Sequence, residues 1–550
     1  MKNQSTFNRR DALKALLGAG ATGALGTLGQ LSLIRNAVAA PAFGDYKALV
    51  CVFLYGGNDS FNMLLPTDAA GHATYSGIRG DLAVSNTDLG LAGISTTGGD
   101  LTTGVLPVAA GNPYNVNQKE ATAYLKGLYG LKDTLGVELG VNGVMPELAQ
   151  LITDQQASVV ANVGNLVNPV TRAQIIDKTA DLPLHLFAHN HQQRALQTGQ
   201  GNNLNDIGWA GRIADKWQDI NGGSPLGLNI SYFGSDRMLI GNETSPLVIN
   251  PNSPPEHLHM RSDPTKSADA DRRALFRALA GQPSATSRVN FGFENTAGTM
   301  DPFKNFYNQS LLKSLTVFDS LNEAWQDDVS YTAKDPYGND LFSVPTAEQL
   351  GFSGTLSGSL IKQLEAVAQM IDLGAGASKA LGPDYNRQVF MVRLGGFDTH
   401  GDQVNKHPKL LREISLALWN FQKALEEKGH ADKTMTFTMS DFGRTMSNNG
   451  DGTDHAWGAH HIVMGGDGSN TIGSLKGGKM VGSLPDLSIG GADDYSSKGR
   501  IIPSLAQDQL NATLCSWFGI EDNMMAEIFP NIGHFKQNAA ISSAYLDLIT

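Results

Sequence analysis

Four short apolar runs, each ended by a glycine or a polar turn, constrain the fold of this chain more than any other feature. They occupy residues 47–54, 157–163, 388–394 and 434–439. Because the first run is almost continuously apolar and the other three are short runs of the same kind, each is expected to be a strand buried on both faces, as in a parallel sheet. Helical patterns separate the runs, at 146–154 and most clearly at 409–427, where Gly429 supplies a stop. The sequence therefore predicts an α/β fold with a mostly parallel central sheet covered by helices.

The first 40 residues have the pattern of an export leader. The pair Arg9-Arg10 precedes a Gly/Ala-rich apolar stretch, Ala12 to Ile34, and Ala37 to Ala39 resembles a cleavage site. This pattern predicts a Tat signal peptide, with the Tat translocase as a partner during export and a periplasmic or secreted location. An uncleaved membrane anchor is the alternative, although small residues weaken the stretch as a permanent span.

The rest of the chain, 41–550, is strongly acidic. The whole chain has a formal charge of −12, and the leader carries five basic residues against one acid, so its removal leaves −16. This charge disfavours binding to nucleic acid or to anionic membranes. No second apolar run reaches about 18 residues, so no stable membrane span is expected in the mature form. Cys51 and Cys515 are the only cysteines, and either a disulfide or two free core thiols would fit them.

Two segments of 41–550 interrupt the expected core. Residues 81–113 are rich in Gly, Thr and Asn, and residues 224–345 carry mixed turn signals. We expect both to be insertions that form loops or a cap over the strand ends.

Acidic side chains follow three of the predicted strands. Asp59, Asp398 and Asp441 fall at or just past strand ends, where ligands bind in open α/β sheets. His400 is two residues from Asp398, so both share a face if the chain stays extended, and His455 lies in a Gly-rich loop. Carboxylate and imidazole are ligands for a divalent cation and are costly to bury without one. These five residues are the predicted metal ligands, although helix caps and ordinary turns would also explain the aspartates.

Two further residues are candidates for a catalytic role. Arg444 follows Asp441 closely and could clamp an anionic substrate group, or form a buried Asp–Arg pair that holds two loops. His189 could line the site, with a surface helix start as the equal alternative. His460 is a weaker candidate ligand.

Several motifs carry a resemblance to a known family. They are GGND at 56–59, VANVGNLVNPVT at 160–171, GWAGR at 208–212, GGFDTHGDQ at 395–403, SDFGRT at 440–445 and TDHAWGAHH at 453–461. With the leader, they resemble the DUF1501 family, which is assigned to the alkaline-phosphatase-like (sulfatase) superfamily. The resemblance implies a three-layer α/β/α sandwich with a metal site at the strand ends. It also implies that Asp398, His400 and His455 hold a first ion, and Asp59 and Asp441 a second roughly 4 Å away.

Two positions depart from the pattern that the resemblance implies. Phe442 stands where superfamily phosphatases have a histidine, which leaves a second ion short of ligands and favours a hard ion or a single one. Ala188 stands where many relatives have a serine, and alanine has no oxygen to act as a nucleophile. The Cys-x-Pro-x-Arg element of sulfatases is also missing. Thr171, Ser60 or a metal-activated hydroxide could substitute, and the hydroxide needs no precisely placed side chain.

The sequence thus predicts an exported hydrolase of phosphate or sulfate esters that depends on one or two divalent ions (Zn, Mn, Mg or Ca). A small anionic ester is the expected substrate, with Arg444 and His189 as catalytic residues. The alternative is a non-catalytic metal-containing binding or assembly protein that has lost its nucleophile at Ala188. The ion, the substrate and the oligomeric state are left open.

Overall fold

A computed structural model describes most of the chain beyond the leader. It covers residues 43–91, 124–204, 206–217, 220–221, 226–252, 271, 274, 321, 329–350, 354–376, 380–382 and 384–550. The expected Tat leader at 1–40 lies outside these residues, as do most of the predicted insertion at 81–113 and much of that at 224–345. Within the described part, none of the helices is long and apolar enough to cross a membrane.

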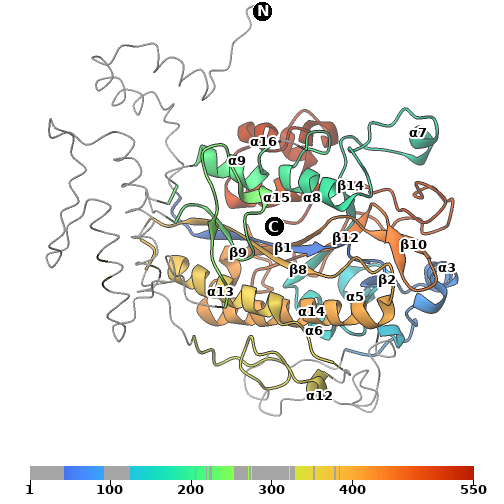
Figure 1. Ribbon diagram of the computed structural model, residues 1–550, viewed down its shortest axis with the longest axis horizontal. Coiled ribbons are helices and arrows are strands. Elements are labelled where there is room, and N and C mark those ends of the chain that lie inside the picture. Colours follow the sequence, from blue (N-terminus) through green and yellow to red (C-terminus); the bar gives the residue numbers. More distant parts are fainter. Residues whose placement is uncertain are drawn as a thin grey trace, which may run out of the picture. The chain divides into compact units, whose positions relative to one another are not determined.

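A nine-stranded, mostly parallel sheet forms the centre (Figure 1). Its strands lie in the order β13 (Met480–Val481), β5 (Ala157–Gly164), β12 (Ala459–Gly465), β9 (Thr434–Ser440), β1 (Lys47–Tyr55), β8 (Arg387–Gly395), β6 (Asn229–Ser231) and β7 (Leu247–Val248), and β14 (Leu505–Ala506) also pairs with β5. β1 is parallel to both β8 and β9, whereas β12 is antiparallel to both of its neighbours. All four apolar runs are strands, so the predicted α/β class and parallel sheet are confirmed.

Helices cover both faces of this sheet, which gives three layers (Figure 1). One layer contains α6 (Pro146–Thr153), α13 (Ser359–Ala375) and α14 (Gln403–Lys428), and the other contains α8 (His189–Thr198), α9 (Trp209–Lys216), α15 (Gln507–Phe518) and α16 (Asp522–Ile528). The strand side chains of β1 from Ala48 to Leu54 are all at most 1% exposed, which explains why the run is apolar at every position.

Helix α14 extends the predicted pattern in the N-terminal direction. It begins at Gln403, six residues before the predicted start, and contains Pro408. Its end agrees with the prediction, because Gly429 adopts a left-handed conformation with φ 70°, which glycine reaches without the Cβ penalty.

Smaller elements surround the main sheet. They are the three-stranded sheet of β2 (Leu64–Pro66), β4 (Leu139–Asn142) and β3 (Leu128–Gly130), the hairpin of β10 (Arg444–Asn448) and β11 (Thr453–His455), and the helices α3 (Ala69–Arg79), α5 (Lys132–Leu135), α7 (Arg172–Ile176) and α12 (Ala347–Leu350). Cys51 in β1 and Cys515 in α15 are buried free thiols, so the structure takes the second of the two alternatives for this pair. Burial raises the pKa of both thiols.

The strand register brings three loops to one edge of the sheet. Tyr55 pairs with Gly395, and Leu54 pairs with both Leu394 and Ser440, so β1, β8 and β9 end at nearly the same level. Because β12 runs the other way, its first residue, Ala459, lies opposite Val163 near the end of β5. The residues that follow β1, β8 and β9 therefore lie at the same edge of the sheet as the residues that precede β12.

Candidate metal centre

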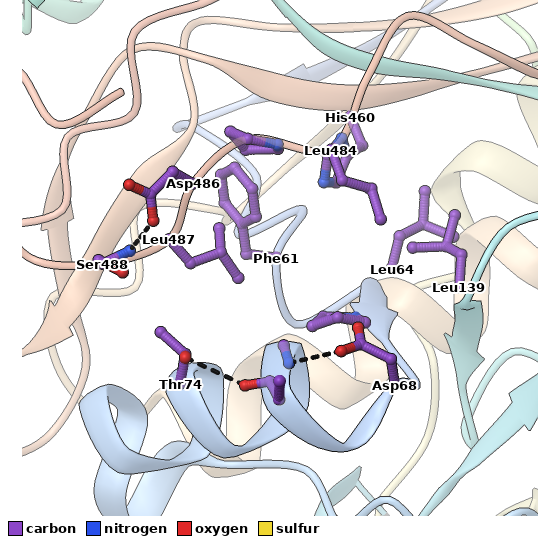
Figure 2. Close-up of a pocket in the computed structure, with 14 residues that line it drawn as sticks. Phe61, Leu64, Asp68, Thr74, Leu139, His460, Leu484, Asp486, Leu487 and Ser488 are labelled. Carbon is purple, nitrogen blue, oxygen red and sulfur yellow. Dashed lines mark hydrogen bonds between the residues drawn. The ribbon is translucent and has the colours of Figure 1, made fainter. Parts of the chain in front are cut away.

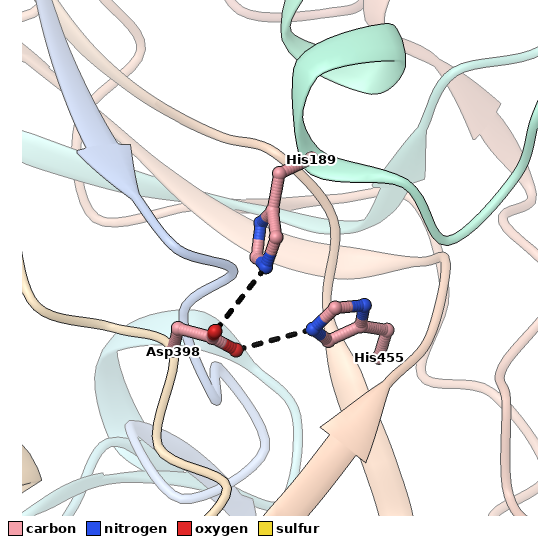
Figure 3. Close-up of side chains that lie close together, drawn as sticks. All are labelled: His189, Asp398 and His455. Carbon is pink, nitrogen blue, oxygen red and sulfur yellow. Dashed lines mark hydrogen bonds and ion pairs between the residues drawn. The ribbon is translucent and has the colours of Figure 1, made fainter.

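Three side chains converge at the carboxyl edge of the sheet (Figure 3). They are His189, Asp398 and His455, and one potential ligand atom from each lies within 4.8 Å of the others. His189 Nε2 is 3.4 Å from Asp398 Oδ2, and His455 Nε2 is 3.1 Å from Asp398 Oδ1. The Asp398 side chain is 46% exposed, so the group is open to solvent on one side.

Each of the three residues comes from a different part of the fold. Asp398 follows β8, His189 is the first residue of α8, and His455 is the last residue of β11. Gly56, which has φ 115°, lets the loop after β1 approach the loop after β8, because a Cβ at this position would lie 2.4 Å from the Asp398 backbone nitrogen. The turn before α8 is also unusual, since Phe187 has φ 72°, a conformation that non-glycine residues rarely adopt.

Hydrogen bonds to Nδ1 determine which ring nitrogen of each histidine is free. His189 Nδ1 is 2.7 Å from Asp441 Oδ2, and His455 Nδ1 is 2.7 Å from the Phe187 carbonyl oxygen. Both partners are acceptors, so each Nδ1 carries a proton and donates it. In the neutral rings, each Nε2 then presents a lone pair towards Asp398. The Nε2 of His189 is buried without a hydrogen-bond partner.

Asp441 orients His189 and does not join the converging group. Its side chain is fully buried, and its Oδ2 accepts hydrogen bonds from His189, from Gln193 Nε2 at 2.9 Å and from the Gly56 backbone N–H at 3.2 Å. The hydrogen bond to Asp441 raises the pKa of His189, against the opposing effect of burial. Its other oxygen, Oδ1, is buried without a hydrogen-bond partner, so the expectation that Asp441 ligates a second ion stays a prediction.

Arg444 holds Asp398 in place. The guanidinium is fully buried, and its Nη1 donates to Asp398 Oδ1 at 2.7 Å. Its other contacts are to Thr453 Oγ1 at 3.3 Å, the Thr453 carbonyl oxygen and the Gly56 carbonyl oxygen at 3.3 Å. Burial works against ionisation of Asp398, but the hydrogen bond and charge of Arg444 hold the pKa of Asp398 below its usual value. This is an Asp–Arg pair that joins two loops, which is the alternative that the sequence left open; the expectation that Arg444 steers an anionic substrate stays a prediction.

His400 lies beside the group on its exposed side. Its Nε2 is 2.8 Å from His455 Nε2 and 3.1 Å from Asp398 Oδ1, and its Nδ1 is 3.1 Å from Asp454 Oδ1. Two imidazole lone pairs cannot face each other at 2.8 Å unless a proton or a cation lies between them or beside them. The three residues expected to hold a first ion, Asp398, His400 and His455, thus lie within 3.1 Å of one another. His189, which the sequence suggested only as a residue lining the site, is the further member of the group.

Asp59 is held by an arginine in the interior. Its oxygens accept from Arg79 Nη2 at 2.7 Å and Nη1 at 2.8 Å, and Gln403 Nε2 donates at 2.6 Å. Both Asp59 and Arg79 are fully buried. A carboxylate that is already neutralised in this way is a poor metal ligand, so this pairing disfavours the expectation that Asp59 binds a second ion, which stays a prediction.

Two other positions singled out in the sequence also have defined places. Phe442 packs against the rings of His189 and His455, with centroids 4.8 and 4.6 Å away, so the aromatic ring walls the group. Ala188 is the N-cap of α8 and makes no side-chain cap. His460 is buried in β12, where its Nδ1 accepts from the Asn162 N–H, so it lies outside the converging group.

Comparison with protein families gives one match. Residues 383–526 match the family described as "Protein of unknown function (DUF1501)". The matched segment contains Asp398, His400, Asp441, Arg444 and His455, whereas His189 and Asp59 precede it. No curated protein matches the chain.

Proposed function

We propose that this chain, whose residues 383–526 belong to the DUF1501 family, is a metal-dependent hydrolase of phosphate or sulfate esters. In this proposal one divalent ion is held by His189, Asp398 and His455. The observation that carries it is the pair of histidine Nε2 atoms, each left with a lone pair by a hydrogen bond at Nδ1, on either side of one carboxylate.

The residues fit a divalent transition metal. The buried Nε2 of His189 has no hydrogen-bond partner, as expected of a ligand atom. Two imidazoles and one carboxylate suit zinc, manganese or iron better than calcium or magnesium, which prefer oxygen ligands. Three protein ligands leave an open position, as in catalytic sites, whereas structural zinc sites usually use four. The exposed side of Asp398 gives that position access to solvent.

The surrounding residues suit reaction at an anionic ester. An ion held there would polarise an ester oxygen and lower the pKa of water. His400 lies on the open side, with its Nε2 3.1 Å from Asp398 Oδ1 and 2.8 Å from His455 Nε2, so its ring borders the open position of the ion. The N-terminus of α8 at Ala188 and His189 adds a positive potential that favours an anion.

One observation favours a second candidate function. Ala188 lies next to His189 at the start of α8 and has no hydroxyl group. If ester hydrolysis at this site needs a side-chain nucleophile, the chain would keep the ion without the reaction. The second candidate is therefore a metal-containing binding or assembly protein.

Metal analysis of the purified protein tests the shared premise. The wild-type chain should retain zinc, manganese or iron after dialysis, and His189→Ala and Asp398→Ala should lose affinity by roughly a hundredfold or more, since loss of an outer partner alone costs about 10–100-fold. His534→Ala is the matched control, because His534 is exposed and bonds to the Val167 carbonyl oxygen outside the group. Equal metal content in all four proteins would remove both candidates.

Hydrolysis assays then separate the two candidates. The metal-loaded wild type is incubated with 4-nitrophenyl phosphate and 4-nitrophenyl sulfate, beside Asp398→Ala and His534→Ala. The hydrolase proposal requires turnover by wild type and His534→Ala that is lost in Asp398→Ala. Metal binding without turnover of either ester class would favour the binding protein.

A further inference from the structure

A second cavity lies apart from the metal centre. It has a volume of about 280 Å³, is partly open to solvent, and is lined by residues of α3, of the strands β2 and β4, and of the loop 484–488 (Figure 2). Apolar side chains dominate its walls, notably Phe61, Leu64, Leu139, Leu484 and Leu487. None of the three converging residues His189, Asp398 and His455 lines it.

The polar groups at the rim of this cavity already have partners within the protein (Figure 2). Asp68 caps α3 by accepting from the Gly71 N–H at 2.7 Å. Thr74 Oγ1 donates to the Ala70 carbonyl oxygen at 3.0 Å. Asp486 accepts through Oδ1 from Ser488 N–H at 2.9 Å and through Oδ2 from Ala492 N–H at 3.2 Å. These groups therefore have little remaining demand for a ligand.

His460 differs from these groups because it is buried in β12 and one of its ring nitrogens lacks a partner. Its Nδ1 accepts from the Asn162 N–H at 3.1 Å, so in the neutral ring the proton is on Nε2. Among the described residues, Nε2 has no hydrogen-bond partner. It is also absent from the polar atoms that are fully buried without a partner, so we infer that it reaches the cavity that His460 lines. The Phe61 ring packs edge-on against the imidazole, with centroids 4.7 Å apart, which fixes its orientation. Burial lowers the pKa of His460 to about 3, so the ring stays neutral.

We propose that this cavity binds a compact, uncharged molecule of one or two rings whose carbonyl oxygen accepts a hydrogen bond from His460 Nε2. The size supports one or two rings, since an apolar cavity of about 150 Å³ holds benzene. The apolar walls disfavour strongly polar ligands, and one placed donor is the usual means by which such a pocket orients its ligand. The carboxylates of Asp68 and Asp486 at the rim disfavour an anion, which separates this ligand class from the substrates proposed for the metal centre.

Two probe molecules of nearly equal shape test the hydrogen bond without changing the protein. Acetophenone carries a carbonyl oxygen and ethylbenzene does not. Their binding to the full chain is measured by ligand-observed NMR titration. Acetophenone should bind more tightly by roughly fivefold, as expected for one neutral hydrogen bond. The ligand is varied because replacing buried His460 would also remove the partner of the Asn162 N–H.

Two variants test the location. Leu484 and Leu487 are half-buried on the loop, so Leu484→Trp or Leu487→Trp should fill the cavity and abolish acetophenone binding while the chain stays folded by circular dichroism. Leu184→Trp is the matched control, because Leu184 is exposed and does not line the cavity. Acetophenone binding that is absent from wild type, or unchanged in both loop variants, would overturn the site. Equal affinity for the two probes would overturn the proposed ligand class.

Discussion

The hydrogen bond that each of the two converging histidines makes at Nδ1 determines whether its Nε2 can bind a metal ion. Asp441 and the Phe187 carbonyl hold the Nδ1 atoms of His189 and His455, which leaves each Nε2 free to bind. Asp441→Ala should therefore weaken metal binding by about 10–100-fold without unfolding the chain. Affinity is measured by titration of metal-free protein. Asp451→Ala is the control, because this acid lies in the turn between β10 and β11 with an exposed side chain; an equal loss in both variants would contradict the role of Asp441.

A buried acid outside the metal centre predicts how stability depends on pH. Asp508 is buried in α15, and burial raises its pKa to about 8, against the opposing charge of Arg212. Because the unfolded carboxyl titrates near its ordinary value of 3.8, the folded state binds more protons between these two pKa values. The contribution of Asp508 to stability is thus full below the lower value and is lost as the pH rises to about 8.

The variant Asp508→Asn tests this contribution. It should be more stable than wild type above pH 8, by on the order of 1 kcal/mol or more, and should show a smaller fall in stability between pH 5 and pH 9. Urea unfolding at several pH values gives both quantities. Parallel curves for the two proteins would show that Asp508 is ionised in the fold.

Single residues also show where reasoning from sequence stops. Asp398 and His455 could be predicted because a strand end and a loop of histidines mark them locally. The roles of Asp59 and Asp441 could not, since the partner of each carboxylate comes from a distant segment. Arg79 pairs with Asp59 from the end of α3, and His189 reaches Asp441 from α8. No local pattern distinguishes a carboxylate that faces an ion from one that faces an arginine.

At the scale of elements, the loop after β1 is shaped by its contact with the loop after β8. A Cβ at Gly56 would lie 2.4 Å from the Asp398 nitrogen, whereas a Cβ at Gly136 would meet nothing within 4 Å. Both glycines have positive φ, 115° and 70°, so both alanine variants carry backbone strain of about 1 kcal/mol. Gly56→Ala should lose about 1–3 kcal/mol more, because overpacking forces the backbone to shift.

Denaturant unfolding of the two glycine variants measures this difference. Gly56→Ala should also lose metal affinity, since the displaced loop carries Asp398, whereas Gly136→Ala should retain it. Equal losses of stability in the two variants would mean that the approach of the two loops does not constrain the site.

Elements with a strong local pattern were also the most predictable. The strands β1, β5, β8 and β9 match the apolar runs within one residue at each end, because burial on both faces keeps charged residues out of most positions and a turn follows each run. The start of α14 was missed, since Pro408 disrupts the periodic pattern near its N-terminus. The residues of β12 contain no pattern from which its antiparallel direction could be predicted.

At the scale of the whole molecule, the three converging residues join segments that are far apart in sequence. An ion bound to all three would stabilise only the folded state, by about 2.7 kcal/mol at a free concentration of 100 times its Kd. Adding a chelator should therefore lower the Tm of the wild-type protein. It should leave the Tm of His189→Ala unchanged, which scanning calorimetry would show. A chelator effect of the same size in both proteins would place the ion elsewhere.

The α/β class could be predicted from the spacing of the buried apolar runs. The number of metal ions could not be predicted from the sequence. The sequence allowed one or two ions, and within the described ranges three residues converge on a single position. Asp59 and one oxygen of Asp441 are engaged by other side chains, and such pairing emerges only once the layers pack.

The reversed direction of β12 has a consequence for how this architecture can diversify. Because β9 ends and β12 begins at the same edge, the segment between them, which includes β10, β11 and His455, leaves and re-enters the sheet without crossing it. The length of this segment can therefore change while the strands of the main sheet keep their hydrogen bonds. One of the three potential ligands, His455, therefore lies on a segment whose length can change while the strands of the main sheet stay paired.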